Sequence, residues 1–241
     1  MVMNLVIDFG NTRIKAAVFS GTKLHEKFLF STSQQLKSFL EKEKIHHCIV
    51  SSVNEPIEEV VSWVDSTGKK LLLSTLLPLP INILYSTPDT LGVDRIAAAC
   101  GAIEIFPKRN CLVIDAGTCI NYEFIDAGSN YHGGAISPGI KMRFDALHKF
   151  TARLPLIKEF NRTELVGNST ESCMTSGVLN GVLAEVKGII DQYSEKFTDL
   201  GVILCGGDAH FFENNLKQPI FAAPDLVLYG LNRILEHNVD H

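Results

Sequence analysis

Two aspartates in this chain each end an apolar, β-branched stretch, and each is followed by one further residue and a glycine. Asp8 lies in LVIDFGNTRIKAAVF at 5–19, and Asp115 lies in LVIDAGTCINYEFI at 112–125. Glycine lets backbone N–H groups approach an anion closely, and successive N–H groups of a turn form an anion-binding concavity. A carboxylate beside such a turn can hold a cation that offsets phosphate charge. One such turn is weak evidence, but its repetition predicts two turns that bind the polyphosphate of a nucleotide.

The elements around the two turns repeat in the same order. In the first half we predict strands at 4–9, 13–19, 23–30, 46–53 and 70–73, and helices at 32–43, 57–64 and 93–105. In the second half we predict strands at 111–116, 119–126, 130–136 and 201–206, and helices at 139–150, 171–197 and 225–237. Three adjacent strands followed by alternating helix and strand, twice over, indicate an internal duplication of an α/β unit. We expect two domains, residues 1–108 and 109–241.

The composition favours a globular intracellular protein. Hydrophobic residues make up 46% of the chain, charged residues 20%, and the net charge is −5, which argues against a general nucleic-acid binder. The longest apolar stretch, at 71–85, contains Pro78 and Pro80 and is too short to span a bilayer. The six cysteines form no CxxC pair, which favours reduced thiols. We therefore expect a cytoplasmic protein with neither a membrane nor a nucleic acid as its partner.

Two familiar nucleotide-binding patterns are missing from the sequence. It contains no GxxxxGK[ST] phosphate loop and no GxGxxG between a strand and a helix. The segment CGGDA at 205–209 is a strand-to-helix turn with two glycines. It either caps a helix and does nothing more or, in a duplicated Asp–Gly fold, lies where an adenine or a ribose is expected.

Six stretches along the chain carry a more specific resemblance. They are DFGNTRIK (8–15), TPDTLGVDR (87–95), DAGTC (115–119), GGAISPG (133–139), TARLP (151–155) and STESCMTSG (169–177). The Asp–x–Gly turns resemble those of the actin and sugar-kinase superfamily, and the six stretches together resemble type III pantothenate kinases in content and order. The resemblance implies an α/β fold of the duplicated ribonuclease-H-like (actin-like ATPase) type, with two similar domains and the nucleotide cleft between them.

The resemblance also implies an activity and its cofactors. Type III pantothenate kinases use ATP to phosphorylate pantothenate to 4′-phosphopantothenate, the first step of coenzyme A biosynthesis, and require Mg²⁺ and a monovalent cation, K⁺ or NH₄⁺. By this resemblance Asp8 lies near the magnesium and Asp115 binds the monovalent cation. The residues expected to contact ATP are Asp8, Phe9, Gly10, Asn11, Thr12, Arg13, Ile14, Lys15, Gly117 and Thr118.

The same resemblance assigns the pantothenate site. Asp94 is expected to accept the proton of the primary hydroxyl, and Thr170 to act across the interface of a homodimer. The residues expected to contact pantothenate are Tyr85, Gly92, Val93, Asp94, Arg95 and Thr170. Many relatives have Ala and a later Thr where Cys119 and Asn121 stand here, so the fine contacts of the second turn differ.

Taken alone, several of these residues have ordinary structural interpretations. An acid in the first turn of a helix, such as Asp94, interacts favourably with the helix dipole. Arg95 alone is typical of a solvated surface charge, and Tyr85 suits loop packing as well as substrate contact. Thr170 is a candidate N-cap, with Ser169 as its competitor.

Three functional hypotheses follow. An ATP-dependent pantothenate kinase is favoured by the GVDR segment at 92–95. A kinase of the same superfamily for another small alcohol or a sugar is the second hypothesis. A non-enzymatic regulator of the same fold is the third, and the presence of Asp8, Asp94 and Asp115 argues against it.

Overall fold

The computed structural model describes residues 3–10, 13–52, 57–160 and 164–239. The chain forms two compact units, each built from separated segments. Unit 1 comprises Met1–Arg109, Glu123–Gly133 and Asp225–His241, and unit 2 comprises Asn110–Tyr122 and Gly134–Pro224. The division into 1–108 and 109–241 concerns the sequence repeat and stays a prediction. The predicted loop residues Asn11 and Thr12 lie outside the described residues.

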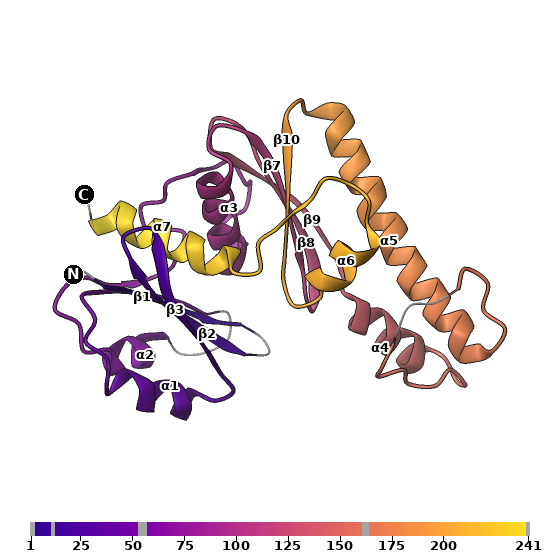
Figure 1. The fold of residues 1–241 in the computed structure, drawn as a ribbon, viewed down its shortest axis with the longest axis horizontal. Helices are drawn as coiled ribbons and strands as arrows, with labels where there is room; N and C mark the ends of the chain where they lie inside the picture. Colours follow the sequence, from indigo (N-terminus) through magenta and orange to yellow (C-terminus); the bar gives the residue numbers. More distant parts are fainter. Residues whose placement is uncertain (1–2, 11–12, 53–56, 161–163, 240–241) are drawn as a thin grey trace. The chain divides into compact units, whose positions relative to one another are not determined.

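The sheet of unit 1 has five strands in the order β3-β2-β1-β4-β5 (Figure 1). Its strands are β1 (Asn4–Phe9), β2 (Ile14–Ser20), β3 (Lys23–Phe30), β4 (His47–Ser52) and β5 (Lys70–Leu72). Strands β1, β2 and β3 pair antiparallel, whereas β4 pairs parallel with β1 and β5. Every residue of β1 is buried, as expected for a central strand covered on both faces.

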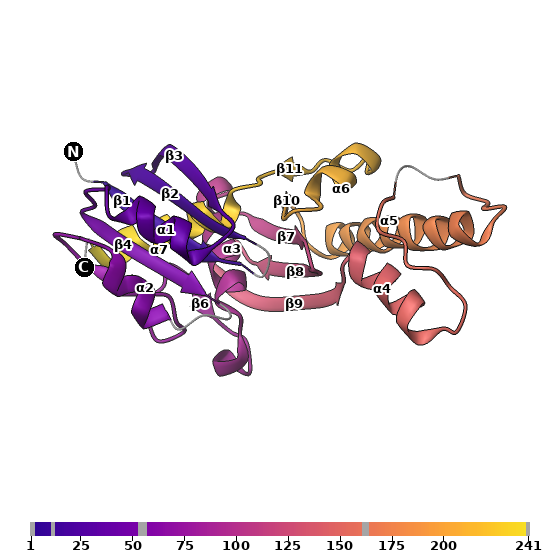
Figure 2. The same cartoon turned by 90° about the horizontal axis from the view of Figure 1, so that it is seen from below.

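Helices cover both faces of this sheet (Figures 1 and 2). On one face, α1 (Ser33–Leu40) and α2 (Ile57–Trp63) share a core with alternate residues of β1. Leu36 and Val60 of these helices pack in one apolar cluster with Leu5 and Ile7. On the other face, α7 (Leu226–Val239) contacts β1, β2 and β4, and α3 (Val93–Ile105) packs beside α7.

Two glycines bring α3 and α7 into backbone contact. A Cβ on Gly230 would lie 1.8 Å from the Ala97 carbonyl oxygen, and a Cβ on Gly101 would lie 2.5 Å from the Leu226 carbonyl oxygen. The two helices therefore pack closer than any side chain at these positions would allow. This contact fixes α3, whose first turn carries Asp94 and Arg95.

The second sheet repeats the order of the first. Its order is β11-β10-β7-β8-β9-β6, so β9-β8-β7-β10-β11 corresponds to β3-β2-β1-β4-β5. The strands are β6 (Asn82–Ile83), β7 (Asn110–Ala116), β8 (Cys119–Ile125), β9 (Asn130–Pro138), β10 (Leu200–Cys205) and β11 (Phe221–Ala222). Strand β7 pairs parallel with β10, as β1 does with β4. The predicted duplication is confirmed.

Unit 2 packs its helices on β7 and β10. They are α4 (Ile140–Phe150), α5 (Thr170–Lys196) and α6 (Ala209–Asn215). Unit 1 also has a short 3₁₀ helix, η1 (Pro88–Thr90), just before α3. Helix α5 is long and apolar enough to cross a membrane, judged by length and composition only. However, its predicted apolar stripe, with Val178, Val182 and Val186, lies in the core with Leu112 and Leu204 of the sheet, as in the core helix of a globular domain.

All six cysteines lie in the described part of the chain, and none of them forms a disulfide. Cys48, Cys100, Cys111 and Cys205 are buried, Cys119 is half-buried and Cys173 is exposed. Burial raises the pKa of Cys48 to about 12, although the nearby Lys70 opposes this shift. The buried thiols therefore behave as small apolar core residues.

Candidate active site

The first Asp–x–Gly turn places a buried carboxylate at the end of β1. Asp8 is 9% exposed, and its partner across the parallel β1–β4 pair is Ser51, whose hydroxyl donates to Asp8 Oδ1 at 2.9 Å. Burial raises the pKa of Asp8, the Ser51 hydrogen bond and the charge of Lys15 oppose the rise, and the charge of Asp94 adds to it. One carboxylate oxygen is thus held by Ser51. The other lies on the side of Gly10, where a Cβ would be 4.0 Å from Oδ2.

The loop after Asp8 divides its residues between the core and the surface. The side chains of Phe9 and Ile14 pack in the apolar cluster of unit 1, so any contact with a phosphate would be made by their backbone. Gly10 and Arg13 are exposed at the loop, and Lys15 is half-buried and faces Asp8 in the β1–β2 register.

Asp94 lies in the first turn of α3, with Gly92 at the N-cap position. The backbone N–H of Arg95 donates to Asp94 Oδ1 at 2.9 Å, which folds the carboxylate back over the helix N-terminus. An acid at this position interacts favourably with the positive end of the helix dipole. The Asp94 carboxylate is half-buried and interacts electrostatically with the Asp8 carboxylate, which also lies in unit 1.

Arg95 is 8% exposed, which excludes the alternative, considered for this residue taken alone, of a solvated surface charge. Its Nε donates to Glu123 Oε1 at 2.6 Å, and its Nη2 donates to Glu123 Oε2 at 2.8 Å. Glu123 is fully buried, and the Tyr131 hydroxyl donates to its Oε2 at 2.5 Å. Burial raises the pKa of Glu123, whereas its hydrogen bonds with Arg95 and Tyr131 lower it.

Tyr85 completes this cluster. The Arg95 Cζ lies 5.6 Å from the centre of the Tyr85 ring, and the two side chains also share a hydrogen bond. On its other side the ring lies against Gly133, where φ is +97° and a Cβ would be 2.8 Å from the ring. The structure therefore brings Tyr85, Gly92, Asp94 and Arg95 together in unit 1, although Tyr85 comes from a loop and the others from α3.

The second Asp–x–Gly turn lies between β7 and β8 in unit 2. The Gly117 N–H donates to the Cys119 carbonyl at 2.8 Å, and Thr118 is exposed at the tip. Gly139 donates its N–H to the Thr118 carbonyl at 3.1 Å, and a Cβ on Gly139 would lie 2.1 Å from the Gly117 carbonyl oxygen. The end of the GGAISPG stretch thus supports the second turn directly.

The CGGDA segment supports the same turn from β10. The Asp208 N–H donates to the Ala116 carbonyl at 2.8 Å, and Gly206 has φ of +93°. A Cβ on Gly206 would lie 2.4 Å from Asp115 Oδ1 and 2.2 Å from the Ala116 carbonyl oxygen. A carboxylate oxygen and a carbonyl oxygen therefore lie close together, and hard oxygen donors of this type suit an alkali cation.

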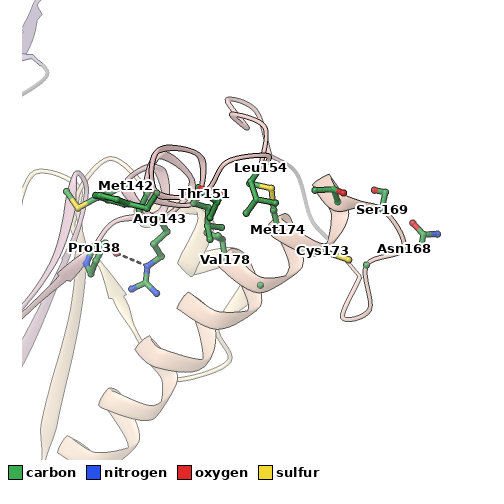
Figure 3. A pocket seen from close by; sticks show the side chains of 16 residues that line it. Pro138, Met142, Arg143, Thr151, Leu154, Asn168, Ser169, Cys173, Met174 and Val178 are labelled. Atoms are coloured by element: carbon green, nitrogen blue, oxygen red, sulfur yellow. Dashed lines mark hydrogen bonds between the residues drawn. The ribbon is translucent and has the colours of Figure 1, made fainter.

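Thr170 is the first residue of α5, but Ser169 is its N-cap. The Ser169 and Ser172 side chains form a reciprocal capping box, so Thr170 is not the cap. The exposed Thr170 instead lines an open groove of about 1500 Å³ in unit 2 (Figure 3). Side chains of α4 and of the first turns of α5 line this groove, and they include Met142, Phe150 and Met174.

Three residues of the site were not predicted from the sequence. Ser51 lies one residue before the end of β4, which is parallel to β1, and parallel strands bring their carboxyl ends to one sheet edge, which is a usable signal. Glu123 and Tyr131 sit within β8 and β9 with no motif around them. Only the folded chain shows that they meet Arg95.

Known proteins match nearly the whole chain in sequence. Residues 4–192 match the sequence profile of the type III pantothenate kinase family. A type III pantothenate kinase from Cytophaga hutchinsonii is 45% identical over 237 residues, covering 98% of this chain and 100% of its own. One from Bacteroides fragilis (strain ATCC 25285) is 44% identical over 240 residues, covering 98% of each chain.

Solved structures share the fold at low sequence identity. A protein described as a Baf family transcriptional activator from Campylobacter jejuni superposes with a TM-score of 0.65 at 22% identity, over 98% of this chain and 100% of its own. The ROK hexokinase from Thermus thermophilus gives a TM-score of 0.52 at 12% identity, over 99% of this chain and 100% of its own. These likenesses confirm the actin-like and sugar-kinase fold. The profile match and the full-length relatives together show that the chain belongs to the type III pantothenate kinase family.

Proposed function

We propose that Asp94 accepts the proton when this chain transfers the γ-phosphoryl group of ATP to the primary hydroxyl of pantothenate. ATP-dependent phosphorylation of pantothenate, at the entry to coenzyme A biosynthesis, is the activity of the family to which the chain belongs. The observation that carries the role of Asp94 is its carboxylate, held at the start of α3 beside the Arg95–Tyr85 cluster and within electrostatic range of Asp8.

The proposed step is an in-line displacement. The hydroxyl oxygen of pantothenate forms a bond to the γ-phosphorus, the bond between that phosphorus and the ADP oxygen breaks, and the hydroxyl proton passes to the Asp94 carboxylate. Phosphoryl transfer proceeds through a loose transition state, so the protein mainly positions groups and stabilises charge. Asp94 therefore needs to orient the hydroxyl and take the proton as the new bond forms.

The two Asp–x–Gly turns are the proposed ATP contacts. The buried Asp8 carboxylate, held by Ser51, suits magnesium, which proteins bind through one or two carboxylates together with substrate phosphates. The bound magnesium would neutralise charge on the phosphates. Asp115 and the Ala116 carbonyl offer oxygens of the type that K⁺ or NH₄⁺ would contact. The exposed Thr118 and the Gly117 backbone are the proposed ATP contacts of the second turn.

The pantothenate carboxylate is the proposed ligand of Arg95. A planar guanidinium matches a carboxylate in a two-point contact. Tyr85 over the guanidinium and Gly92 beside Asp94 complete the unit 1 part of this site. Thr170, exposed on unit 2, is the remaining proposed contact.

We further propose that the groove beside Thr170 binds a second copy of the chain. Phe150, which lines the groove, is 80% exposed, and Leu165 and Val166 in the segment that leads to α5 are 79% and 81% exposed. Apolar side chains this exposed, next to an apolar groove, are typical of a protein interface. A homodimer formed here would cover them and place Thr170 at the interface.

Two other functions fit the data less well. The likeness to the Campylobacter protein, at 22% identity, concerns the fold alone, so it does not favour a transcriptional regulator. A kinase for another alcohol would not need the GVDR segment at 92–95. The free thiols suit the cytoplasm, where we place the enzyme.

The proposal is tested by ADP release from ATP and Mg²⁺, with and without pantothenate, in potassium and then in sodium buffer. Pantothenate-dependent release that collapses in sodium supports both the kinase and the cation site at Asp115. Release that depends on pantothenate and is equal in both buffers keeps the kinase and overturns the cation assignment. Folded, ATP-binding protein without pantothenate-dependent release overturns the activity.

A further inference from the structure

We infer that Glu123 is a positioning residue, which fixes the guanidinium of Arg95 so that one edge is presented to the substrate. The inference rests on the proposed role of Arg95 in binding the pantothenate carboxylate. Glu123 itself is fully buried, and its carboxylate accepts from the Arg95 guanidinium. Its effect on the reaction therefore passes through Arg95.

The hydrogen bonds between Arg95 and Glu123 determine which edge of the guanidinium can still contact a substrate. An arginine side chain has five N–H donors in a rigid planar fork. The Glu123 carboxylate takes the Nε hydrogen at 2.6 Å and one Nη2 hydrogen at 2.8 Å. Glu123 does not contact the fork formed by Nη1 and the second Nη2 hydrogen on the adjacent edge, and the hydrogen bond with Tyr85 uses one of the three remaining hydrogens. That fork is the second two-point edge of the group, and it suits a carboxylate.

Glu123 can hold the guanidinium because Glu123 is itself held. Its Oε2 accepts from the Tyr131 hydroxyl at 2.5 Å as well as from Arg95. Tyr131 is fully buried in β9, and Glu123 is fully buried in β8, so both side chains are fixed by their strands. On one face of the guanidinium lies the Tyr85 ring, 5.6 Å from Cζ and packed against Gly133. These contacts fix the plane of the guanidinium.

The pair is better explained by positioning than by stability. Two charges taken out of water lose hydration that their mutual attraction only partly restores, so a buried ion pair is a weak source of stability. The Arg95–Glu123 pair also lies directly beside Asp94, since the Arg95 N–H donates to Asp94 Oδ1. A pair with a purely structural role would not need to begin at the residue after the proposed proton acceptor.

The chain contains a matched control for this cluster. In unit 2, Glu185 accepts from Arg143 Nη2 at 2.6 Å and from the Tyr122 hydroxyl at 3.1 Å, so it has the same partner types as Glu123. None of these residues is a proposed contact of ATP or pantothenate, although Arg143 also lines the groove of unit 2. Glu185→Gln thus reports the general effect of weakening a Glu–Arg–Tyr cluster.

The experiment measures kcat and the KM values for pantothenate and ATP in the full-length chain and in Glu123→Gln, Arg95→Lys, their double variant and Glu185→Gln. Loss of a charged hydrogen-bond partner is worth roughly a tenfold to hundredfold change in affinity. We expect Glu123→Gln to raise the KM for pantothenate about tenfold or more, with the KM for ATP within twofold of wild type. Glu185→Gln should leave both KM values unchanged.

The double variant separates positioning from a general structural effect. If Glu123 acts through Arg95, adding Glu123→Gln to Arg95→Lys raises the KM for pantothenate no further. Independent, multiplying effects would overturn the inference, and so would a folded Glu123→Gln variant with the wild-type KM. Circular dichroism at the assay temperature checks folding, and if Glu123→Gln is unfolded then Glu123→Asp, which keeps the charge but withdraws the carboxylate, undergoes the same test. A wild-type enzyme without pantothenate-dependent turnover would overturn the proposed function and this inference together.

Discussion

Gly92 provides the space that the Asp94 carboxylate occupies, because a Cβ at position 92 would lie 2.5 Å from Asp94 Oδ1. Gly92→Ala would therefore push the carboxylate away from the N-terminus of α3. A misplacement of about 1 Å at a reacting group can cost roughly a hundredfold in rate, so we expect kcat to fall about tenfold to a hundredfold. Steady-state kinetics measures this. Gly188→Ala is the control, since a Cβ there meets no atom within 4 Å, and an equal loss in the control would contradict the explanation.

Alanine substitutions at the neighbouring positions Gly206 and Gly207 should differ in their effect on the free energy of unfolding. Gly206 has φ of +93°, and a Cβ would lie 2.2 Å from the Ala116 carbonyl oxygen, whereas a Cβ on Gly207 meets nothing within 4 Å. Strain of this kind costs on the order of 1–3 kcal/mol. We expect urea unfolding to show such a loss for Gly206→Ala and little change for Gly207→Ala. Equal stabilities of the two variants would contradict the close approach of β10 to the second turn.

We predict that the ionised Asp8 carboxylate lowers the free energy of unfolding, although the proposed magnesium site needs this carboxylate. Burial raises the pKa of Asp8, so the folded chain holds this proton more tightly than the unfolded chain does. The ionised carboxylate then costs stability as the pH rises through the folded-state pKa, and this cost is absent at pH values below the unfolded-state pKa. Asp8→Asn should therefore raise the free energy of unfolding by on the order of 1 kcal/mol near pH 7, and the gain should vanish in acid.

The same Asp8→Asn variant should lose nearly all activity, since it lacks the carboxylate proposed for magnesium. Unfolding curves at pH 7.5 and pH 3 and one assay with ATP and Mg²⁺ check both parts. Full activity in Asp8→Asn would contradict the magnesium role. Lower stability than wild type at pH 7.5 would contradict the electrostatic argument.

If the groove of unit 2 binds a second copy of the chain, as proposed, the protein should form a dimer whose fraction rises with protein concentration. Phe150 is 80% exposed on the groove, so Phe150→Asp would place a charge in the proposed interface. Central apolar interface residues carry about 2 kcal/mol or more, so the dissociation constant should rise at least about thirtyfold. Sedimentation velocity at several concentrations measures it. Leu76→Asp is the control, because Leu76 is 91% exposed in unit 1, and a dimer that survives Phe150→Asp would contradict the assignment.

Much of the fold could be predicted from local patterns. The buried strand at β1 and the helix at α3 were predicted with their observed bounds, because an uninterrupted apolar run and a helical stripe each identify one kind of element. The two-residue strands β6 and β11 were not predicted, and only the start of the short helix α6, at the CGGDA turn, was. Strand β6, for example, forms only by pairing with Asn130 and Tyr131, which are distant in the sequence.

The site could be predicted only in part, and for the same reason. Asp8, Asp94 and Asp115 lie in short motifs that the sequence displays directly. Glu123 alternates with apolar residues in a strand, which is the ordinary pattern for a residue that faces water. Its burial depends on Arg95, 28 positions away, so no local signal identifies it. Arg95 alone has the pattern of a surface charge, and only the GVDR segment at 92–95 marks it as a site residue.

The most direct test of the account measures the rate of 4′-phosphopantothenate formation by mass spectrometry, in wild type and in Asp94→Asn, at saturating ATP and pantothenate. General-base catalysis contributes roughly a hundredfold to ten-thousandfold, so the account predicts a loss of that size in Asp94→Asn, with binding of both substrates retained. A folded Asp94→Asn variant that forms 4′-phosphopantothenate at the wild-type rate would contradict it.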